Sequence, residues 1–422
     1  MNLKSRINDH TLFNAGLYLY FVFAYLSESF RWGNLVIVAS LLLMIMTKLR
    51  KRFLSLSKSD MNLLAYIVVF AAYACLSRLW AESPRLTINK SNALVFIVAA
   101  MAVIVVCKYD ELSIETVLKV IMYGGYTVGL YILFRYGLRG ILTLMRNEQR
   151  LGAVLNANTL GMCVSYAMLI NFYFISYERR FRIQYLLMLP MLVILIATGS
   201  RKAVLILIAG VFALFVMKNF NNRKALNSLL KVLLGAILLA VVIYFVLKLP
   251  ALSKISGRLK SMFIVLVGGG TRSTDGWLRV QYVKLGLQLF ARHPILGIGL
   301  GNANLYTSAY WGHDHYLHNN YVELLATLGI VGTLLYYSMY LYILSIFWKK
   351  RKSGRDRDFD ICMIILLVRL VMDYGAVFFY NKETYIFLLL FWIEARKLKA
   401  GSAALRFDPE NRSALSSAQS GS

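Results

Sequence analysis

Long apolar runs constrain the fold of this 422-residue chain more than any other feature. A helix that crosses a bilayer needs about 20 predominantly apolar residues. Hydrophobic residues make up 59% of the chain, and they gather in about 12 such runs. The sequence therefore predicts an all-α polytopic integral membrane protein with about 12 transmembrane helices, since a barrel would need short alternating strands. The runs lie near residues 11–28, 33–47, 61–80, 92–107, 113–135, 153–176, 184–199, 203–219, 227–248, 321–348, 359–379 and 383–396.

These runs divide the chain into four parts. Residues 1–248 hold the first nine predicted spans, and residues 321–400 hold the last three. Residues 249–320 form a long segment between spans, which we expect to contain an amphipathic helix that ends before Pro294. The tail, residues 401–422, is rich in Ser and Ala and is expected to be disordered in the cytoplasm. The apolar residues of the expected helix near helical spacing are Trp277, Val280, Val283, Leu287 and Phe290.

The distribution of basic residues predicts the orientation and indicates an anionic ligand. Lys and Arg number 47 against 20 Asp and Glu, a net charge of +27. The most basic loops lie on one side if both termini are cytoplasmic. The opposite side also carries basic residues, which the orientation rule does not predict, and these favour an anion at the outer membrane–water boundary over nucleic acid. Solvated loop charge with lipid headgroup contact is the alternative. The outward residues include Arg78, Arg85, Lys90, Arg135, Arg139, Arg146, Arg150, Arg201, Lys202, Arg279, Lys284 and Arg292.

Three histidines, His313, His315 and His318, crowd into the segment just before the tenth predicted span. Their spacing is not a sharp zinc signature, and the four cysteines all lie in apolar stretches, so neither a metal site nor a disulfide framework is expected. His318 can serve as a general base poised near neutral pH, or as a loop histidine with a structural role. Asn319 is expected to cap the following helix, and Tyr321 to share a helix face with His318.

Polar residues at other span boundaries are further candidates. Arg201 and Lys202 follow the seventh predicted span, and RLGAVLNANTLG places Arg150, Asn156 and Asn158 before the sixth. Arg369 and Asp373 lie four residues apart inside the eleventh span and are interpreted as a structural ion pair. The glycines of GIGLGNAN lack the strand and helix context of a nucleotide site, so they predict a tight loop instead.

The order of these motifs resembles that of the O-antigen ligase and O-antigen polymerase family of bacterial envelopes. The matching pieces are RLGAVLNANTLG, TGSRKA, LRVQYVKLGLQLFARHPILGIGLGN and HNNYVELLATLGIVG, over roughly residues 150–335. The chain has Asn–Ala–Asn where many relatives have Asn–Pro–Asn, a difference in local loop geometry at Ala157.

The resemblance implies a class C-like, inverting glycosyltransferase without metal or other cofactor. Its donor would be a glycan on undecaprenyl diphosphate, and its acceptor a glycan or lipid A–core. It would be a multi-pass protein of the bacterial inner membrane, in contact with membrane lipids, with its active site facing the periplasm. His318, Arg201 and Arg279 match the family's functional positions. Substrate-binding roles are expected for Arg150, Asn156, Asn158, Arg85, Lys202, Asn319 and Tyr321.

Alternative functions stay open at this point. An O-antigen ligase of lipopolysaccharide biosynthesis is favoured slightly over a polymerase that joins lipid-linked repeats, because a single long outward loop precedes the histidines. A flippase for lipid-linked oligosaccharides would show internal repeats, which the sequence lacks. A peptidoglycan polymerase of the shape-and-division family has fewer spans and other motifs. The sequence does not indicate an oligomeric state.

Overall fold

A computed structural model describes residues 3–49, 57–107, 112–147, 149–152, 154–177, 183–219, 227, 275–350 and 357–407. These residues form 13 α-helices with short connections, which confirms an all-helical membrane protein. The predicted span 227–248 lies outside them except for residue 227, as do residues 249–274 and 408–422.

The helices follow the apolar runs along the chain. The first eight are α1 (Leu3–Leu26), α2 (Gly33–Leu49), α3 (Lys58–Leu76), α4 (Pro84–Cys107), α5 (Ile114–Arg146), α6 (Ala157–Tyr177), α7 (Met188–Thr198) and α8 (Arg201–Asn219). The other five are α11 (Asp275–Arg292), α12 (Ala303–Trp311), α13 (Asn320–Lys350), α14 (Arg357–Met372) and α15 (Thr384–Phe407).

Five of these helical segments are long and apolar enough to cross a membrane. Two shorter helices, Gly33–Leu49 and Tyr185–Thr198, are also apolar. The five long segments alone make the chain polytopic, whether or not the other helices cross the membrane. The five segments are Lys58–Leu79, Pro84–Cys107, Ile114–Met145, Ala157–Tyr177 and Asn320–Lys350. All four cysteines are free, and three of them are buried.

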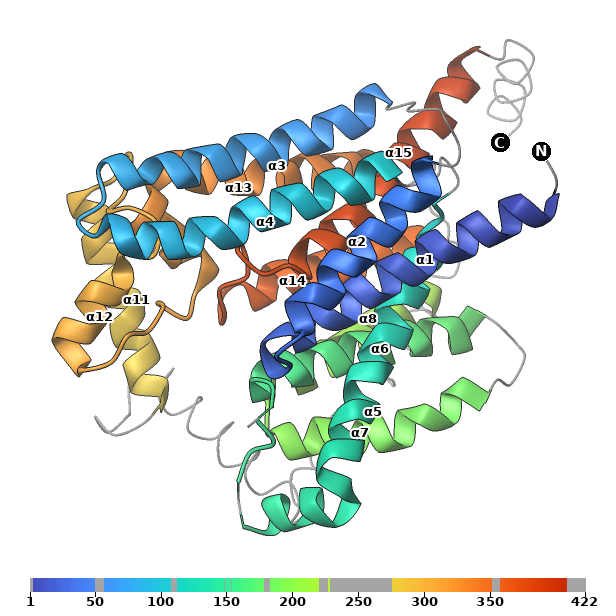
Figure 1. Ribbon diagram of the computed structural model, residues 1–422, viewed down its shortest axis with the longest axis horizontal. Coiled ribbons are helices and arrows are strands. Elements are labelled where there is room, and N and C mark those ends of the chain that lie inside the picture. The colour runs from blue at the N-terminus through green and yellow to red at the C-terminus, as the bar shows by residue number, and fades with distance from the viewer. Residues whose placement is uncertain are drawn as a thin grey trace.

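Figure 1 shows the described helices gathered into one bundle with a small appendage. The appendage consists of α11 and α12, which lie beside the turn between α3 and α4. The start of α1 and the end of α15 lie at the opposite end of the bundle. The buried side chains of α11 and α12 form a small cluster of their own with the first turns of α13, so the appendage rests on α13.

Helix α13 is broken in its first half at Gly329, whose φ is 65° and ψ −168°. The connection after α11 fills the break. The N–H groups of Ile298 and Gly299 donate to the carbonyl oxygens of Ala326 and Thr327, at 3.0 and 2.9 Å. In return the N–H of Ile330 donates to the carbonyl oxygen of Pro294 at 2.9 Å. The backbone groups that the break would leave unpaired are therefore satisfied, as a buried, apolar setting demands.

The glycines at this contact are needed for space as well as conformation. A Cβ on Gly329 would lie 2.1 Å from the carbonyl oxygen of Ile295, and one on Gly297 would lie 2.5 Å from that of Thr327. Asn302 then ties the same loop to the α3–α4 turn, since its Oδ1 accepts from the N–H of Ser83 at 2.7 Å. The tight loop predicted from the glycines is confirmed.

The predicted span 359–379 is wrong in its last part. Helix α14 ends at Met372, and residues 373–379 form a non-helical segment that is buried except at Tyr374 and, in part, Gly375. Asn320 holds this segment: its Oδ1 accepts from the N–H of Phe378 at 2.8 Å, and its own N–H donates to the carbonyl oxygen of Asp373 at 2.7 Å. The apolar composition of this segment correctly predicted that most of it is buried. Composition does not distinguish a helix from an irregular segment, because side chains such as that of Asn320 can satisfy the backbone groups of an irregular segment.

Arg369 and Asp373 are both buried, but they do not form the expected direct ion pair. The Arg369 guanidinium donates to Thr384 Oγ1 at 3.0 Å and lies over the rings of Phe378 and Phe387. Asp373 Oδ2 instead accepts from Tyr337 Oη at 2.7 Å. Because Asp373 has left the helix, the i, i+4 geometry on which the prediction rested does not apply.

Three further expectations need correction. Helix α15 continues to Phe407, so residues 401–407 are helical rather than part of a disordered tail. Helix α12 was not predicted at all. Helix α11 has the predicted bounds, but its buried face is Tyr282, Leu285 and Leu289, whereas Val280 and Leu287 are 38% and 47% exposed. The helix therefore has apolar residues on two faces. The sequence pattern assigned some residues of the exposed face, Val280 and Leu287, to the apolar face of the helix.

Replacement of Gly329 with Ala tests the break in α13. Both the backbone strain, about 1–3 kcal/mol for a side chain in this region, and the clash with Ile295 should destabilise the protein. Gly137 is a matched control because it has nearly the same backbone angles, φ 64° and ψ 161°, with nothing within 4 Å of the added Cβ. In thermal unfolding of detergent-solubilised protein, Gly329→Ala should lower the Tm much more than Gly137→Ala. Equal shifts would show that the packed loop contributes nothing.

Candidate functional site

His318 lies immediately before α13 in a strained, well-anchored turn. Its φ of 57° makes it the one non-glycine residue in the left-handed region among the described residues. Asn319 caps α13 as predicted, because its Oδ1 accepts from the N–H of Val322 at 3.1 Å. The buried carboxylate of Glu323 accepts from the N–H of Leu317 at 2.7 Å. Bonds on both sides of His318 thus fix a conformation that costs about 1–3 kcal/mol by itself.

Aromatic rings surround the His318 imidazole. Tyr282 of α11 stacks on it with ring centroids 5.6 Å apart and an interplanar angle of 24°. The rings of Tyr316 and His315 lie 4.3 and 5.9 Å away. The side chain is therefore half-buried between the appendage and the end of the bundle, on a rigid element.

This environment keeps the imidazole neutral. Burial, followed by the positive charges of Arg279 and Lys202 and by the nearby His315, lowers the pKa of His318 to about 3. At neutral pH the ring therefore carries one unprotonated nitrogen that can accept a proton. The same interaction places Arg279 and Lys202 within electrostatic range of His318.

Four basic side chains form a cation cluster around Lys202, and two of them, Lys202 and Arg279, also act on His318. Burial, then the charges of Arg279, Arg201 and Arg150, lower the pKa of Lys202 to about 7. Arg201 and Lys202 are the first residues of α8, where the helix dipole adds a partial positive charge. Arg279 comes from α11 and Arg150 from the loop before α6. A site of this composition attracts an anion strongly, because bringing cations together is unfavourable until one binds.

Lys202 is also held by the irregular segment after α14. A Cβ on Gly375 would lie 2.7 Å from Lys202 Cε and 3.1 Å from its Nζ, so the lysine passes over bare backbone at this position. The segment that Asn320 anchors to the start of α13 therefore also packs against the lysine of α8.

Arg150 is oriented by two hydrogen bonds. Its Nε donates to the carbonyl oxygen of Thr198 at 2.9 Å, and its Nη2 donates to Asn158 Oδ1 at 2.8 Å. Asn156 accepts from the N–H of Asn158 at 2.9 Å and thereby caps α6. The two asparagines of the Asn–Ala–Asn motif thus have structural partners: one begins a helix and the other directs a guanidinium.

Three sequence-predicted residues do not join the cluster of cations. Arg85 is exposed in the first turn of α4. Asn319 is buried as a helix cap. Tyr321 does not share a face with His318, because His318 is not helical; its hydroxyl donates to the carbonyl oxygen of Leu370 at 2.7 Å, and its ring stacks on Tyr337.

Sequence reasoning missed the aromatic walls of the site. Tyr282 lies three residues after Arg279 on α11, and this spacing places the two on one helix face, so the signal was present. Nothing in the sequence pointed to Tyr316. His313 and His315 contact each other edge to face, with ring centroids 5.3 Å apart. Within the described parts of the chain, no group of three or more His, Cys, Asp or Glu side chains is placed to hold a metal ion.

Most of the candidate site lies within a segment of the chain that matches a known protein family. Residues 186–337 match the family model described as O-antigen ligase, and comparison with curated proteins gives no match. The match contains Arg201, Lys202, Arg279 and His318, and it begins after Arg150. The chain is thus a polytopic membrane protein, and the family that its residues 186–337 match consists of membrane glycan-transferring enzymes. The chain carries an O-antigen ligase domain over these residues, which confirms the family resemblance, and proteins of this family act on lipid-linked glycans.

Removal of the Tyr282 ring tests whether burial sets the protonation of His318. In protein with labelled histidines, the His318 signal, assigned with His318→Gln, should stay neutral at pH 5. Tyr282→Ala admits water, so the pKa of His318 should rise toward 6.5. Tyr310, 65% exposed with no ring contact to His318, provides the control Tyr310→Ala. A wild-type ring that protonates near pH 6.5 would contradict the assignment.

Proposed function

We propose that the chain is an O-antigen ligase: an inverting, metal-independent glycosyltransferase that moves a glycan from undecaprenyl diphosphate to a sugar hydroxyl of lipid A–core. The observation that carries the proposal is the convergence of Lys202, Arg279 and His318 from three separate elements. A cation cluster beside a neutral imidazole suits a reaction with an anionic leaving group and an alcohol nucleophile.

The cations suit the diphosphate. Guanidinium groups stay charged at any relevant pH and bind phosphate oxygens through paired N–H donors. In this reaction the acceptor oxygen bonds to the anomeric carbon as the bond from that carbon to the diphosphate breaks. Undecaprenyl diphosphate leaves with the bonding electron pair, and Arg279 and Arg201 stabilise the charge that develops on it. Attack opposite the leaving group inverts the anomeric carbon.

His318 suits the proton. The acceptor hydroxyl gives its proton to the unprotonated ring nitrogen, which passes it to water after transfer. An imidazole with a pKa of about 3 is a weak base, but two of the causes of that low value are the charges of Arg279 and Lys202. A bound diphosphate offsets both charges, so the donor itself raises the basicity of His318. The base is thus weak in the empty site and stronger in the loaded one.

The orientation follows from the chemistry and the basic loops. We infer that the end of the bundle with α11 and α12 faces the periplasm of the bacterial inner membrane, and that both termini are cytoplasmic. The polyprenyl chain of the donor lies among the membrane lipids while its diphosphate reaches the cations. Asn158 contributes by directing Arg150, which in turn lies close to Lys202.

Reconstituted transfer from purified lipid-linked glycan in liposomes tests the roles. His318→Ala should lower kcat by about 10²–10⁴-fold, because the hydroxyl loses its base. Arg279→Ala should lower it by about 10²–10³-fold, and Arg279→Lys by less, because a lysine keeps the charge but loses the paired donors.

Lys284→Ala is the matched control for Arg279→Ala, because replacement of this exposed lysine also removes one positive charge from α11. EDTA should leave the rate unchanged. Wild-type turnover in His318→Ala would exclude His318 as the general base. A strong loss of activity in Lys284→Ala would show that the effect of Arg279→Ala reflects only the change in net charge.

The acceptor decides between ligase and polymerase. The same liposomes are supplied with donor and either lipid A–core or a second lipid-linked repeat. A ligase transfers glycan to lipid A–core at a rate at least tenfold above that to the second repeat. Elongated glycan that stays on the carrier would identify a polymerase, and movement of the donor between leaflets without transfer would identify a flippase.

A further inference from the structure

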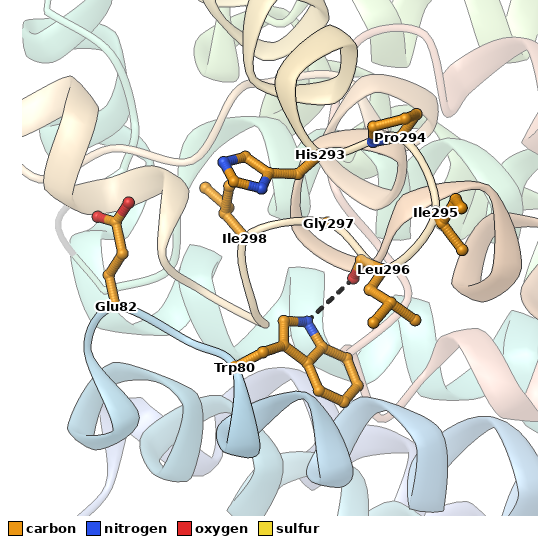
Figure 2. A pocket seen from close by; sticks show the side chains of 8 residues that line it. All are labelled: Trp80, Glu82, His293, Pro294, Ile295, Leu296, Gly297 and Ile298. Atoms are coloured by element: carbon orange, nitrogen blue, oxygen red, sulfur yellow. Dashed lines mark hydrogen bonds between the residues drawn. The ribbon is translucent and has the colours of Figure 1, made fainter.

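A pocket of about 310 Å³ lies between the α3–α4 turn and the loop after α11, away from the cation cluster (Figure 2). Trp80 and Glu82 line it from the turn, and His293 and Pro294 to Ile298 line it from the loop. None of the sequence-predicted site residues belongs to this lining. Its volume falls at the small end of the range of about 300–1,000 Å³ for ligand sites.

The pocket lies at the opposite end of α11 from Arg279. Arg279 and His293 are 14 positions apart along a continuous helix and its last turn. At 1.5 Å per residue this separation is roughly 21 Å. A ligand here is therefore not the sugar whose bond is made or broken, but it can be another part of the same long substrate.

The walls of the pocket are fixed before any ligand arrives. The indole N–H of Trp80 donates to the carbonyl oxygen of Leu296 at 3.2 Å, as Figure 2 shows. The hydroxyl of Tyr306 on α12 donates to the Glu82 carboxylate. Ser83, the next residue, is tied to Asn302 of the glycine-rich loop. Preorganised polar groups lose little entropy on binding, which favours a true binding surface.

The lining is mostly apolar and carries two charged or polar side chains, a combination that suits the apolar faces and the hydroxyl edge of a sugar ring. Trp80 and Ile298 offer an aromatic and an aliphatic wall for the C–H faces of a pyranose. Glu82 and His293 are exposed, and Figure 2 shows both side chains on the same side of the pocket. A carboxylate and an imidazole bind sugar hydroxyls, whereas an alkyl chain would desolvate them without return.

We propose that this pocket is a second glycan-binding subsite, which holds a sugar of the donor glycan several units away from the transferred bond. The identity of the ligand as a glycan rests on the proposed function. Binding energy from a remote sugar can then position the reacting end, and long glycans are preferred over short ones.

Saturation-transfer NMR on the full-length protein in nanodiscs tests the subsite. The probe is the oligosaccharide released by mild acid from the lipid carrier of the strain that supplies the donor. Trp80→Ala and Glu82→Gln should each reduce transfer to the sugar protons at least fivefold. The control is Trp32→Ala, since Trp32 is 64% exposed and lies in the turn before α2. His318→Ala should keep the signal, so loss of catalysis and loss of the subsite are separable.

Kinetics supply a second measurement. In Trp80→Ala the KM for the complete donor should rise at least fivefold, whereas the KM for a carrier bearing a single sugar should stay unchanged, because one sugar does not reach the pocket. Trp80→Phe should retain most of the effect. Unchanged saturation transfer in Trp80→Ala, equal KM shifts for both donors, or displacement of the oligosaccharide by an alkyl detergent chain would each overturn the proposal.

Discussion

The break in α13 at Gly329 is the constraint on which the rest of the described structure depends. An unpaired backbone group in an apolar interior costs several kcal/mol, so a broken helix persists only where other groups pair with it. Here the loop after α11 supplies those partners, and Tyr73 of α3 donates its hydroxyl to the carbonyl oxygen of Leu328 at 2.9 Å. The loop cannot move without exposing the break. Helix α11, with Arg279 and Tyr282, is thereby fixed relative to the turn that carries His318.

The second irregular segment fixes the other half of the site. Asn320, one residue into α13, pairs the backbone of residues 373–379, and Gly375 of this segment packs against Lys202. Helix α8 packs on α14 as well, so the lysine is held from two directions. One stretch of chain, from His318 to Gly329, therefore sets the positions of the cations from α8 and α11. This explains why polar side chains spread from Arg150 to His318 along the chain can act on one another in space.

The sequence predicted burial better than backbone conformation. The apolar runs located eleven of the helices that the structure describes, and the cap at Asn319 was correct because a cap depends on neighbours in sequence. The break at Gly329 was not predicted, since a run of apolar residues around a single glycine fits a straight span equally well. Residues 373–379 failed for the same reason. Both need a partner distant in sequence to satisfy their backbone, and composition carries no information about that partner.

The predicted positions of individual polar residues likewise held where local sequence determines them and failed where tertiary structure does. Tyr321 was placed beside His318 by helical spacing, but the left-handed φ of His318 removes it from the helix. Asn158, for which a substrate-binding role is expected, accepts a hydrogen bond from Arg150. At Tyr321 the helical-spacing rule failed because the tertiary structure imposes a special conformation on His318. Tyr282 is the opposite case, because a regular helix relates it to Arg279.

The electrostatics of the empty site connect these observations to catalysis. Lys202 and three arginines are closer together than like charges favour, and the folded bundle holds them there. An anion that binds relieves this repulsion, so part of its affinity is already stored in the fold. The same anion raises the proton affinity of His318, whose low pKa results from burial and from those charges. In the proposed mechanism, donor binding and activation of the base are therefore one event, because His318 becomes a stronger base only when the diphosphate offsets the neighbouring charges.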